Sequence, residues 1–158
     1  MRVENLIKTL ADELQLPFRI IDLQDSAALQ EALSAIKLVL HAAGPYVYTA
    51  KQMIEACLQT GTHYIDINGD ISVLEMLKKQ DAAATKKNIK LMPGAGFDVV
   101  PTDCIALRLK NKIPDATHLK LAFATIGGGL SHGTAITMAG KLGEGGAVRE
   151  NGKIVGKP

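Results

Sequence analysis

The most informative segment of the chain reads Pro93-Gly94-Ala95-Gly96-Phe97-Asp98-Val99-Val100-Pro101. A short apolar run precedes it as a predicted strand, and a helix is predicted from Pro101, which suits a first helical turn because it lacks an N–H. Its glycines let the backbone turn sharply or approach a ligand closely, and Asp98 adds a carboxylate. Loops of this kind, from strand to helix, hold the chemistry of many α/β proteins. From these residues alone, a tight turn with incidental glycine and aspartate is the alternative interpretation.

Predicted strands and helices alternate along the chain around this loop. Short apolar runs predict strands at Phe18–Leu23, Lys37–Ala43, His63–Ile67 and Ile89–Met92. Apolar residues at helical spacing predict helices at Glu4–Gln15, from Asp25 or Ser26 to Ile36, and from about Thr49 to Gln59, Ser72 to Lys86 and Pro101 to Lys110. This alternation is typical of βαβ units around a parallel sheet.

Local patterns refine the expected elements. Thr49-x-x-Gln52 and Ser72-x-x-Glu75 each predict a capping box, in which two side chains satisfy the first free amides of a helix. The continuous apolar run Leu38-Val39-Leu40 is typical of a strand covered on both faces.

Composition excludes several classes of protein. The 158 residues carry a net charge of +2 from scattered Lys and Glu, which gives no support to nucleic-acid or membrane-surface binding. No run reaches the ~18 apolar residues of a membrane span, and no signal peptide is apparent. Cys57 and Cys104 lie among apolar neighbours in predicted helices, without metal or disulfide spacing. We therefore expect buried free thiols in a cytoplasmic protein that acts on a small molecule.

The pattern changes after Pro114. Thr117–Ile126 predicts a long, partly alternating strand, and Glu150-Asn151-Gly152-Lys153 predicts a hairpin turn. We therefore expect one α/β domain over residues 1–114, and the beginning of a second, α+β domain over residues 115–158.

Three successive predicted strands end in loops of special composition, at the sheet edge where parallel α/β proteins bind ligands. Gly44 and Gly96 could let backbone amides contact a flat ring or a phosphate, and Tyr46 and Phe97 offer faces for stacking. Four carboxylates are expected on this rim and could bind an amine or hydroxyls, or act as acid or base: Asp66, Asp70, Asp98 and Asp103. The alternative is that Gly and Asp are simply common in turns.

No catalytic dyad or metal site is evident in the sequence. The adjacency of Ser131 and His132 does not make a dyad, and the four histidines share no metal-ligand spacing. Gly94-x-Gly96 is not a dinucleotide fingerprint, because Val99 stands where the third glycine would be. The catalytic residue therefore stays unknown, with Asp66, Asp70 and Asp98 as candidates.

Ordered motifs across nearly the whole chain resemble the saccharopine dehydrogenase-like oxidoreductases, the group that includes saccharopine reductases and trans-acting enoyl reductases. The motifs are Ala43-Gly44-Pro45-Tyr46, Glu55-Ala56-Cys57, Gly61-Thr62-His63-Tyr64-Ile65-Asp66-Ile67-Asn68-Gly69-Asp70, Gly96-Phe97-Asp98-Val99-Val100-Pro101-Thr102-Asp103, Ser131-His132-Gly133-Thr134-Ala135 and Val148-Arg149-Glu150-Asn151-Gly152. Departures are mild: Asp70 stands for Glu, and Val99 and Thr102 stand for serines.

The resemblance implies an NADP-dependent reductase with a doubly wound, Rossmann-like parallel sheet. Residues 1–114 would then be a partial NAD(P)-binding domain, and residues 115–158 the beginning of a domain for substrate binding or dimerisation. It implies cofactor contacts near the nicotinamide from two loops, namely Gly44, Pro45 and Tyr46, and Gly96, Phe97 and Asp98. Asp66, Gly69 and Asp70 would lie near an imine or unsaturated substrate. Arg2 is the one residue that matches the arginine expected to read the NADP 2′-phosphate.

Relative to this family, the chain lacks the first βαβ unit with its glycine-rich pyrophosphate loop, and most of the second domain. We therefore expect an internal fragment that is inactive alone and binds NADP weakly or not at all. The open strand edges should either pair Phe18–Leu23 with the Leu38–Ala43 strand or form an intermolecular sheet in a homo-oligomer. The alternative is a non-catalytic remnant that folds and self-associates.

Overall fold

The computed structural model describes residues 2–122, 124, 126–129, 132–143 and 145–157. In chain order, the elements are α1 (Arg2–Leu14), α2 (Ser26–Leu33), β1 (Leu38–His41), α3 (Tyr46–Thr60), β2 (His63–Asp66), α4 (Ile71–Lys78), α5 (Asp81–Lys87), β3 (Leu91–Met92), α6 (Val100–Lys112), α7 (His132–Gly140), β4 (Gly146–Glu150) and β5 (Lys153–Lys157).

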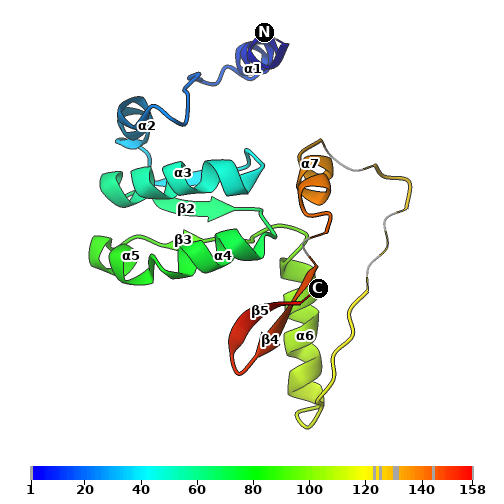
Figure 1. The fold of residues 1–158 in the computed structure, drawn as a ribbon. Coiled ribbons are helices and arrows are strands. Elements are labelled where there is room, and N and C mark those ends of the chain that lie inside the picture. Colours follow the sequence, from blue (N-terminus) through cyan, green and yellow to red (C-terminus); the bar gives the residue numbers. More distant parts are fainter. Residues whose placement is uncertain (1, 123, 125, 130–131, 144, 158) are drawn as a thin grey trace.

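A parallel sheet forms the centre of the fold (Figure 1). Its strands run in the order β1-β2-β3, with Leu40 opposite Ile65 and Ile65 opposite Met92. Helices connect each strand to the next, so the predicted class is confirmed as α/β with a partial Rossmann-like sheet. Because the strands are parallel, their carboxyl ends meet at one edge.

The core covers only one face of this sheet. Val39, Tyr64 and Leu91 lie in register on that face and pack against apolar side chains of α2, α3 and α4. On the opposite face, Leu38 and Leu40 are 56% and 60% exposed. The prediction that this run is covered on both faces is therefore wrong, because no helix among the described residues packs on its second side.

The N-terminal quarter also differs from expectation. Residues 18–23 form no strand, so their predicted direct pairing with β1 is wrong. β-Branched residues favour a strand only where a neighbouring strand can accept their backbone hydrogen bonds. Ile21 and Leu23 nevertheless pack against the core. Helix α1 is confirmed, and it stands apart from the sheet at the end of this linker (Figure 1).

Two predicted capping boxes are wrong. Helix α3 begins at Tyr46, ahead of Thr49, whose hydroxyl donates instead to the carbonyl of Ala43 at 2.7 Å. Helix α4 is capped by Asp70, whose carboxylate accepts from the amide of Ser72 at 2.9 Å. A turn at residues 79–80 also divides the predicted helix Ser72–Lys86 into α4 and α5.

Beyond the sheet, the chain is more open. Helix α6 buries none of its residues, and Cys104 on this helix is exposed. The prediction of a buried thiol is therefore wrong for Cys104 and confirmed for Cys57. The predicted hairpin is confirmed as β4 and β5, with Asn151 and Gly152 both at positive φ in the turn. Residues 117–122 form no strand, and positions 123 and 125 of that predicted strand lie outside the described residues. The division into two domains at residue 115 stays a prediction.

Helices of the described residues are all too short or too polar to cross a bilayer.

Close packing at the strand ends leaves no room for a Cβ atom at Gly96. A Cβ at position 96 would lie 2.7 Å from the carbonyl oxygen of Ile67, so Gly96→Ala should lower the free energy of unfolding by about 1–3 kcal/mol. Urea denaturation measures this change. Gly140→Ala is the matched control, because a Cβ there would meet nothing within 4 Å. Equal effects of the two substitutions would contradict the packing argument.

Candidate functional site

The carboxyl ends of the three strands and α7 enclose a pocket of about 530 Å³. Its residues come from the loop after β1 with the start of α3, from the loop after β2, from the loop before α6, and from α7. They are Ala42, Gly44, Pro45, Tyr46, Val47, Ile67, Asn68, Gly69, Asp70, Asp98, Gly133, Thr134, Thr137, Met138 and Lys141. This pocket therefore lies at the sheet edge where the sequence predicts a functional site.

The carboxylate of Asp66 organises the loops beneath this pocket. It is fully buried at the end of β2. Its Oδ1 accepts from the amide of Gly94 at 2.8 Å, and from the backbone and side-chain nitrogens of Asn68 at 3.1 and 2.6 Å. The carbonyl of Asp66 also accepts from the amide of Ala95 at 2.8 Å. Asp66 thus ties the loop after β2 to the loop after β3.

A hydrogen-bonded chain extends from Asp66 to β1. The Tyr64 hydroxyl donates to Asp66 Oδ2 at 2.6 Å, and Nδ1 of His41 lies 3.0 Å from that hydroxyl. The hydroxyl proton of Tyr64 is used in its hydrogen bond to Asp66. Nδ1 of His41 must therefore carry a proton and donate it in a hydrogen bond to the Tyr64 oxygen. Burial, together with the bond to Asp66, raises the pKa of Tyr64. All three strand ends therefore share one polar network.

His41 remains neutral within this network. Burial lowers its pKa, an effect that the nearby Asp66 partly offsets. Its ring meets the rings of Tyr46 and Tyr64 edge-on, at centroid distances of 5.2 and 5.8 Å. His41 Nε2 has no hydrogen-bond partner among the described residues. His41 is consequently a core histidine beneath the pocket, and it is absent from the pocket lining.

Tyr46 forms one wall of the pocket. Its hydroxyl donates to the carbonyl of His41 at 3.3 Å, which holds the ring against the strand end. Burial raises the pKa of Tyr46, and Asp66 adds to the effect, so the phenol stays protonated at neutral pH. The peptide bond between Gly44 and Pro45, just before it, is cis.

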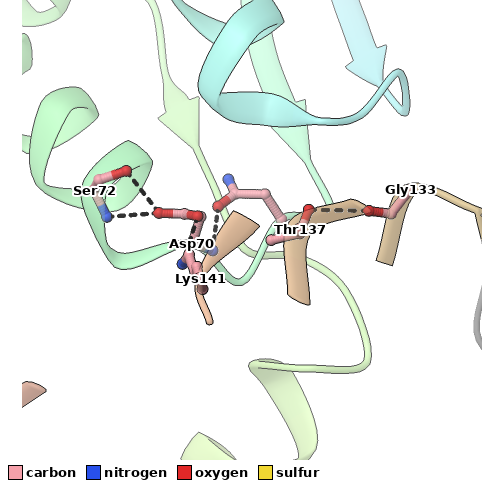
Figure 2. Close-up of polar contacts among 6 residues, drawn as sticks. Asp70, Ser72, Gly133, Thr137 and Lys141 are labelled. Atoms are coloured by element: carbon pink, nitrogen blue, oxygen red, sulfur yellow. Dashed lines mark hydrogen bonds and ion pairs between the residues drawn. The ribbon is translucent and has the colours of Figure 1, made fainter. Parts of the chain in front are cut away.

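Asp70 connects the loop after β2 to α7, as Figure 2 shows. Its Oδ1 accepts from the amide and hydroxyl of Ser72, and Lys141 Nζ lies 2.7 Å from Oδ2. Burial pushes the pKa of Asp70 upward, but the bonds to Lys141 and Ser72 outweigh it and hold the pKa below its usual value. Asp70 is thus an ionised, paired carboxylate near neutral pH.

The structure separates the predicted site residues into three groups. Gly44, Pro45, Tyr46, Gly69, Asp70 and Asp98 line the pocket. Asp66 lies buried under it, and its two oxygens are occupied by hydrogen bonds. Gly96, Phe97 and Asp103 are outside the lining; Gly96 packs on Ile67, while Phe97 is 72% exposed. The expectation that all four carboxylates share the rim is therefore wrong for Asp66 and Asp103.

Sequence reasoning missed the contribution of α7. Lys141, Thr137 and Met138 line the pocket, and the Thr137 hydroxyl donates to the carbonyl of Gly133 at 3.0 Å (Figure 2). Nothing in the local sequence links Lys141 to Asp70. The sequence analysis also missed that Asn68 forms hydrogen bonds with both Asp66 and Asp70. Its position between these two aspartates in a strand-end loop could have predicted this role.

Charged groups give the pocket its chemical character. Lys141 neutralises Asp70, so Asp98 is the lining carboxylate without an ion pair among the described residues. The wall also includes the apolar side chains of Val47, Ile67 and Met138. Among the described residues, no three His, Cys, Asp or Glu side chains are grouped to hold a metal ion. The pocket therefore suits a mostly apolar group that is neutral or cationic.

Removing the Asp66 carboxylate should destabilise the protein strongly. Asp66→Ala leaves buried donors on Tyr64, Asn68 and Gly94 without an acceptor, which should cost about 3–5 kcal/mol of unfolding free energy. Chemical denaturation measures it. Asp22→Ala is the control, because that exposed side chain accepts from one amide, that of Gln24. A loss at position 66 as small as at position 22 would contradict the proposed role of the network.

His41 should make stability depend on pH. Burial holds the pKa of folded His41 below the ordinary histidine value of about 6.5, so the unfolded chain binds the extra proton first as pH falls. The free energy of unfolding should therefore be highest above pH 6.5, and fall as pH drops through 6.5 toward the folded pKa. Denaturation from pH 8 to 5 tests this, with His41→Asn expected to flatten the slope. An identical slope in both proteins would contradict it.

The chain is similar in sequence to proteins of one known family. Residues 2–92 match the family model described as the saccharopine dehydrogenase NADP binding domain. The saccharopine dehydrogenase-like oxidoreductase of Mus musculus is 32% identical over 111 residues, which cover 70% of this chain and 26% of that protein. The trans-acting enoyl reductase of Mycobacterium leprae (strain TN) is 31% identical over 101 residues, covering 61% of this chain and 23% of that protein.

A solved structure shows the same fold. Apo saccharopine dehydrogenase (L-Glu forming) from Saccharomyces cerevisiae superposes with a TM-score of 0.58 at 18% identity, over 69% of this chain and 23% of that one. The chain thus spans about a quarter of the length of the curated relatives it matches. With more than half of its residues matched by the family model, the chain belongs to the saccharopine dehydrogenase NADP-binding domain family.

Proposed function

We propose that the pocket at the carboxyl edge of the sheet receives the nicotinamide end of NADP(H), as part of an oxidoreductase that reduces a small imine or unsaturated substrate. One observation carries the proposal: in a chain of an NADP-binding family, the lined pocket lies where parallel sheets bind nucleotides. Its volume of about 530 Å³ is also typical of cofactor and ligand sites.

The residues present fit a nicotinamide group. Gly44, Pro45 and Tyr46 would hold one side of it, and Asp98 would face it from the loop before α6. Gly69 leaves room beside Asp98, because a Cβ there would lie 3.2 Å from the Asp98 Cβ. NADPH, when bound, would supply the hydride. The chain's own contribution is to orient the ring and to exclude water with Val47, Ile67 and Met138.

The same residues favour the nicotinamide end over the phosphates. With Asp70 paired to Lys141, the uncompensated charge in the lining is the negative Asp98. That charge repels phosphate and favours a neutral carboxamide or a cationic ring. The sequence also contains no G-x-G-x-x-G loop to hold a pyrophosphate. We therefore expect weak binding of the whole cofactor by this chain.

The alternative function is a non-catalytic domain, and one observation favours it. Of the three candidate carboxylates, Asp66 is saturated by hydrogen bonds and the pKa of Asp70 is held low. Asp66 therefore has no oxygen left for a substrate, and Asp70 cannot deliver a proton as a general acid near neutral pH. Asp98 is left as the one candidate that could contact a reacting group directly.

Ligand-observed and protein amide NMR test the proposal with two probes. Nicotinamide mononucleotide should bind in the millimolar range and shift the amides of Gly44, Tyr46, Gly69 and Asp98, whereas 2′,5′-ADP should shift none of these. Val47→Trp, whose larger side chain would occupy part of the pocket, should weaken binding several-fold. Tyr48→Trp is the control, because Tyr48 lies on the same helix outside the lining.

Each result has a defined meaning. Shifts scattered away from the pocket, or equal binding by the two variants, would overturn the nicotinamide site. Binding by this chain, without NADPH oxidation by a longer protein that contains it when candidate imines and enoyl compounds are supplied, would favour the non-catalytic alternative.

A further inference from the structure

Three consecutive turns in the loop after β2 lead from the buried Asp66 to Ser72 at the start of α4. In each turn, a side-chain oxygen accepts from the backbone amide two residues later. The amide of Asn68 donates to Asp66 Oδ1 at 3.1 Å, and the amide of Asp70 donates to Asn68 Oδ1 at 2.9 Å. The amide of Ser72 then donates to Asp70 Oδ1, also at 2.9 Å. Because each turn fixes the backbone locally, the series forms a defined path from the core to the pocket.

Asn68 is the middle residue of this series. It lines the pocket and is only 2% exposed. Its side-chain amide fits in one orientation, with Nδ2 donating to Asp66 Oδ1 at 2.6 Å and Oδ1 accepting from the amide of Asp70. An aspartate at this position would place an oxygen against Asp66, and an apolar side chain would satisfy neither neighbour. The asparagine therefore connects the two aspartates through opposite ends of one amide group.

The carboxylate at the end of this path receives Lys141. Asp70 is held through its amide by Asn68 and through Oδ1 by Ser72, which leaves Oδ2 at a defined place. Lys141 Nζ lies 2.7 Å from that oxygen (Figure 2). The Asp70 side chain is 9% exposed and that of Lys141 is 49% exposed, and a lysine ammonium sits on a flexible four-carbon chain. The aspartate therefore sets where the ion pair forms, and the lysine adapts to it.

Lys141 transmits this position to α7. Its amide donates to the carbonyls of Thr137 and Met138, each at 3.2 Å, so Lys141 continues the last turn of the helix. Thr137, Met138 and Lys141 all line the pocket. A displacement of Asp70 would therefore move three residues of one pocket wall together.

We propose that Asn68 is a positioning residue of the pocket, which fixes the main chain at Asp70 and thereby holds Lys141 and α7 in the pocket wall. The identity of the ligand rests on the proposed nicotinamide site, whereas the position of α7 does not. One hydrogen bond of ordinary strength corresponds to about a 2- to 10-fold change in an equilibrium constant. Loss of the bond from the Asp70 amide to Asn68 should weaken ligand binding by a factor of this size.

Two substitutions separate the two bonds of the Asn68 side chain. Asn68→Ala and Asn68→Ser both remove the donor to Asp66, but a serine hydroxyl can still accept from the amide two residues later. NMR titration of the Asp70 carboxyl carbon in the ligand-free protein is the first readout. In Asn68→Ala its midpoint should move to higher pH, because the bonds to Lys141 and Ser72 that hold the pKa of Asp70 low are loosened.

The second and third readouts are the amide signals of α7 and the affinity for nicotinamide mononucleotide. In Asn68→Ala the amides of Thr137 and Met138 should shift, and the mononucleotide should bind about 2- to 10-fold more weakly. Asn68→Ser should stay close to the wild type in all three readouts.

Thr62→Val is the control for lost stability. It removes buried hydrogen bonds to the carbonyls of Leu33 and Ile36, outside the pocket lining. It should leave the Asp70 titration, the α7 amides and the affinity unchanged. Unchanged Asp70 and α7 signals in Asn68→Ala would overturn the inference, and so would equal changes in Asn68→Ser or in Thr62→Val.

The readouts also distinguish this inference from the proposed function. If the wild type does not bind nicotinamide mononucleotide, the proposed function fails, and the Asp70 and α7 signals alone decide the role of Asn68. Undiminished binding by Asn68→Ala with displaced α7 signals would overturn the role of Asn68 in ligand binding. Should Asn68→Ala fail to fold, hydrogen exchange of the wild type decides: the Asp70 amide should be protected, and a freely exchanging amide would overturn the inference.

Discussion

The hydrogen bonds of the buried Asp66 carboxylate hold together the loops at the sheet edge where the pocket lies. A charge taken out of water is costly unless hydrogen bonds replace its hydration. Here four donors from Tyr64, Asn68 and Gly94 replace it. These donors belong to β2 and to the loops after β2 and β3, so satisfying the charge also fixes the loops. The same saturation removes Asp66 from the list of groups that could contact a substrate.

The sequence was sufficient where local periodicity and turn chemistry decide the structure. The three strands, the hairpin turn at Asn151-Gly152 and the meeting of Tyr46, Asp70 and Asp98 at one sheet edge all follow from such patterns. Residues 18–23 show the limit of this reasoning. Their β-branched composition permits a strand, but a strand exists only where a second one accepts its hydrogen bonds.

Long-range contacts could not be predicted for a similar reason. The ion pair of Asp70 with Lys141 joins residues that no repeat, motif or period connects. The apolar run at β1 raised the opposite difficulty, because continuous apolarity indicates two covered faces without saying which element covers each. Leu38 and Leu40 are apolar as expected, yet among the described residues their face has no helix against it. The composition of a strand indicates that its side chains favour burial, but the arrangement of the other elements determines whether they are buried.

The interactions that give Asp70 a structural role, as a helix cap and an ion-pair partner, also make it unsuitable as a general acid. As the cap of α4 it accepts two hydrogen bonds from Ser72, and these bonds favour the ionised form. Lys141 stabilises the same form and attaches α7 to the pocket wall. A general acid needs the opposite, a proton held at neutral pH. The interactions that build the pocket from distant segments therefore leave Asp98, on the loop before α6, as the lining carboxylate without an ion pair among the described residues.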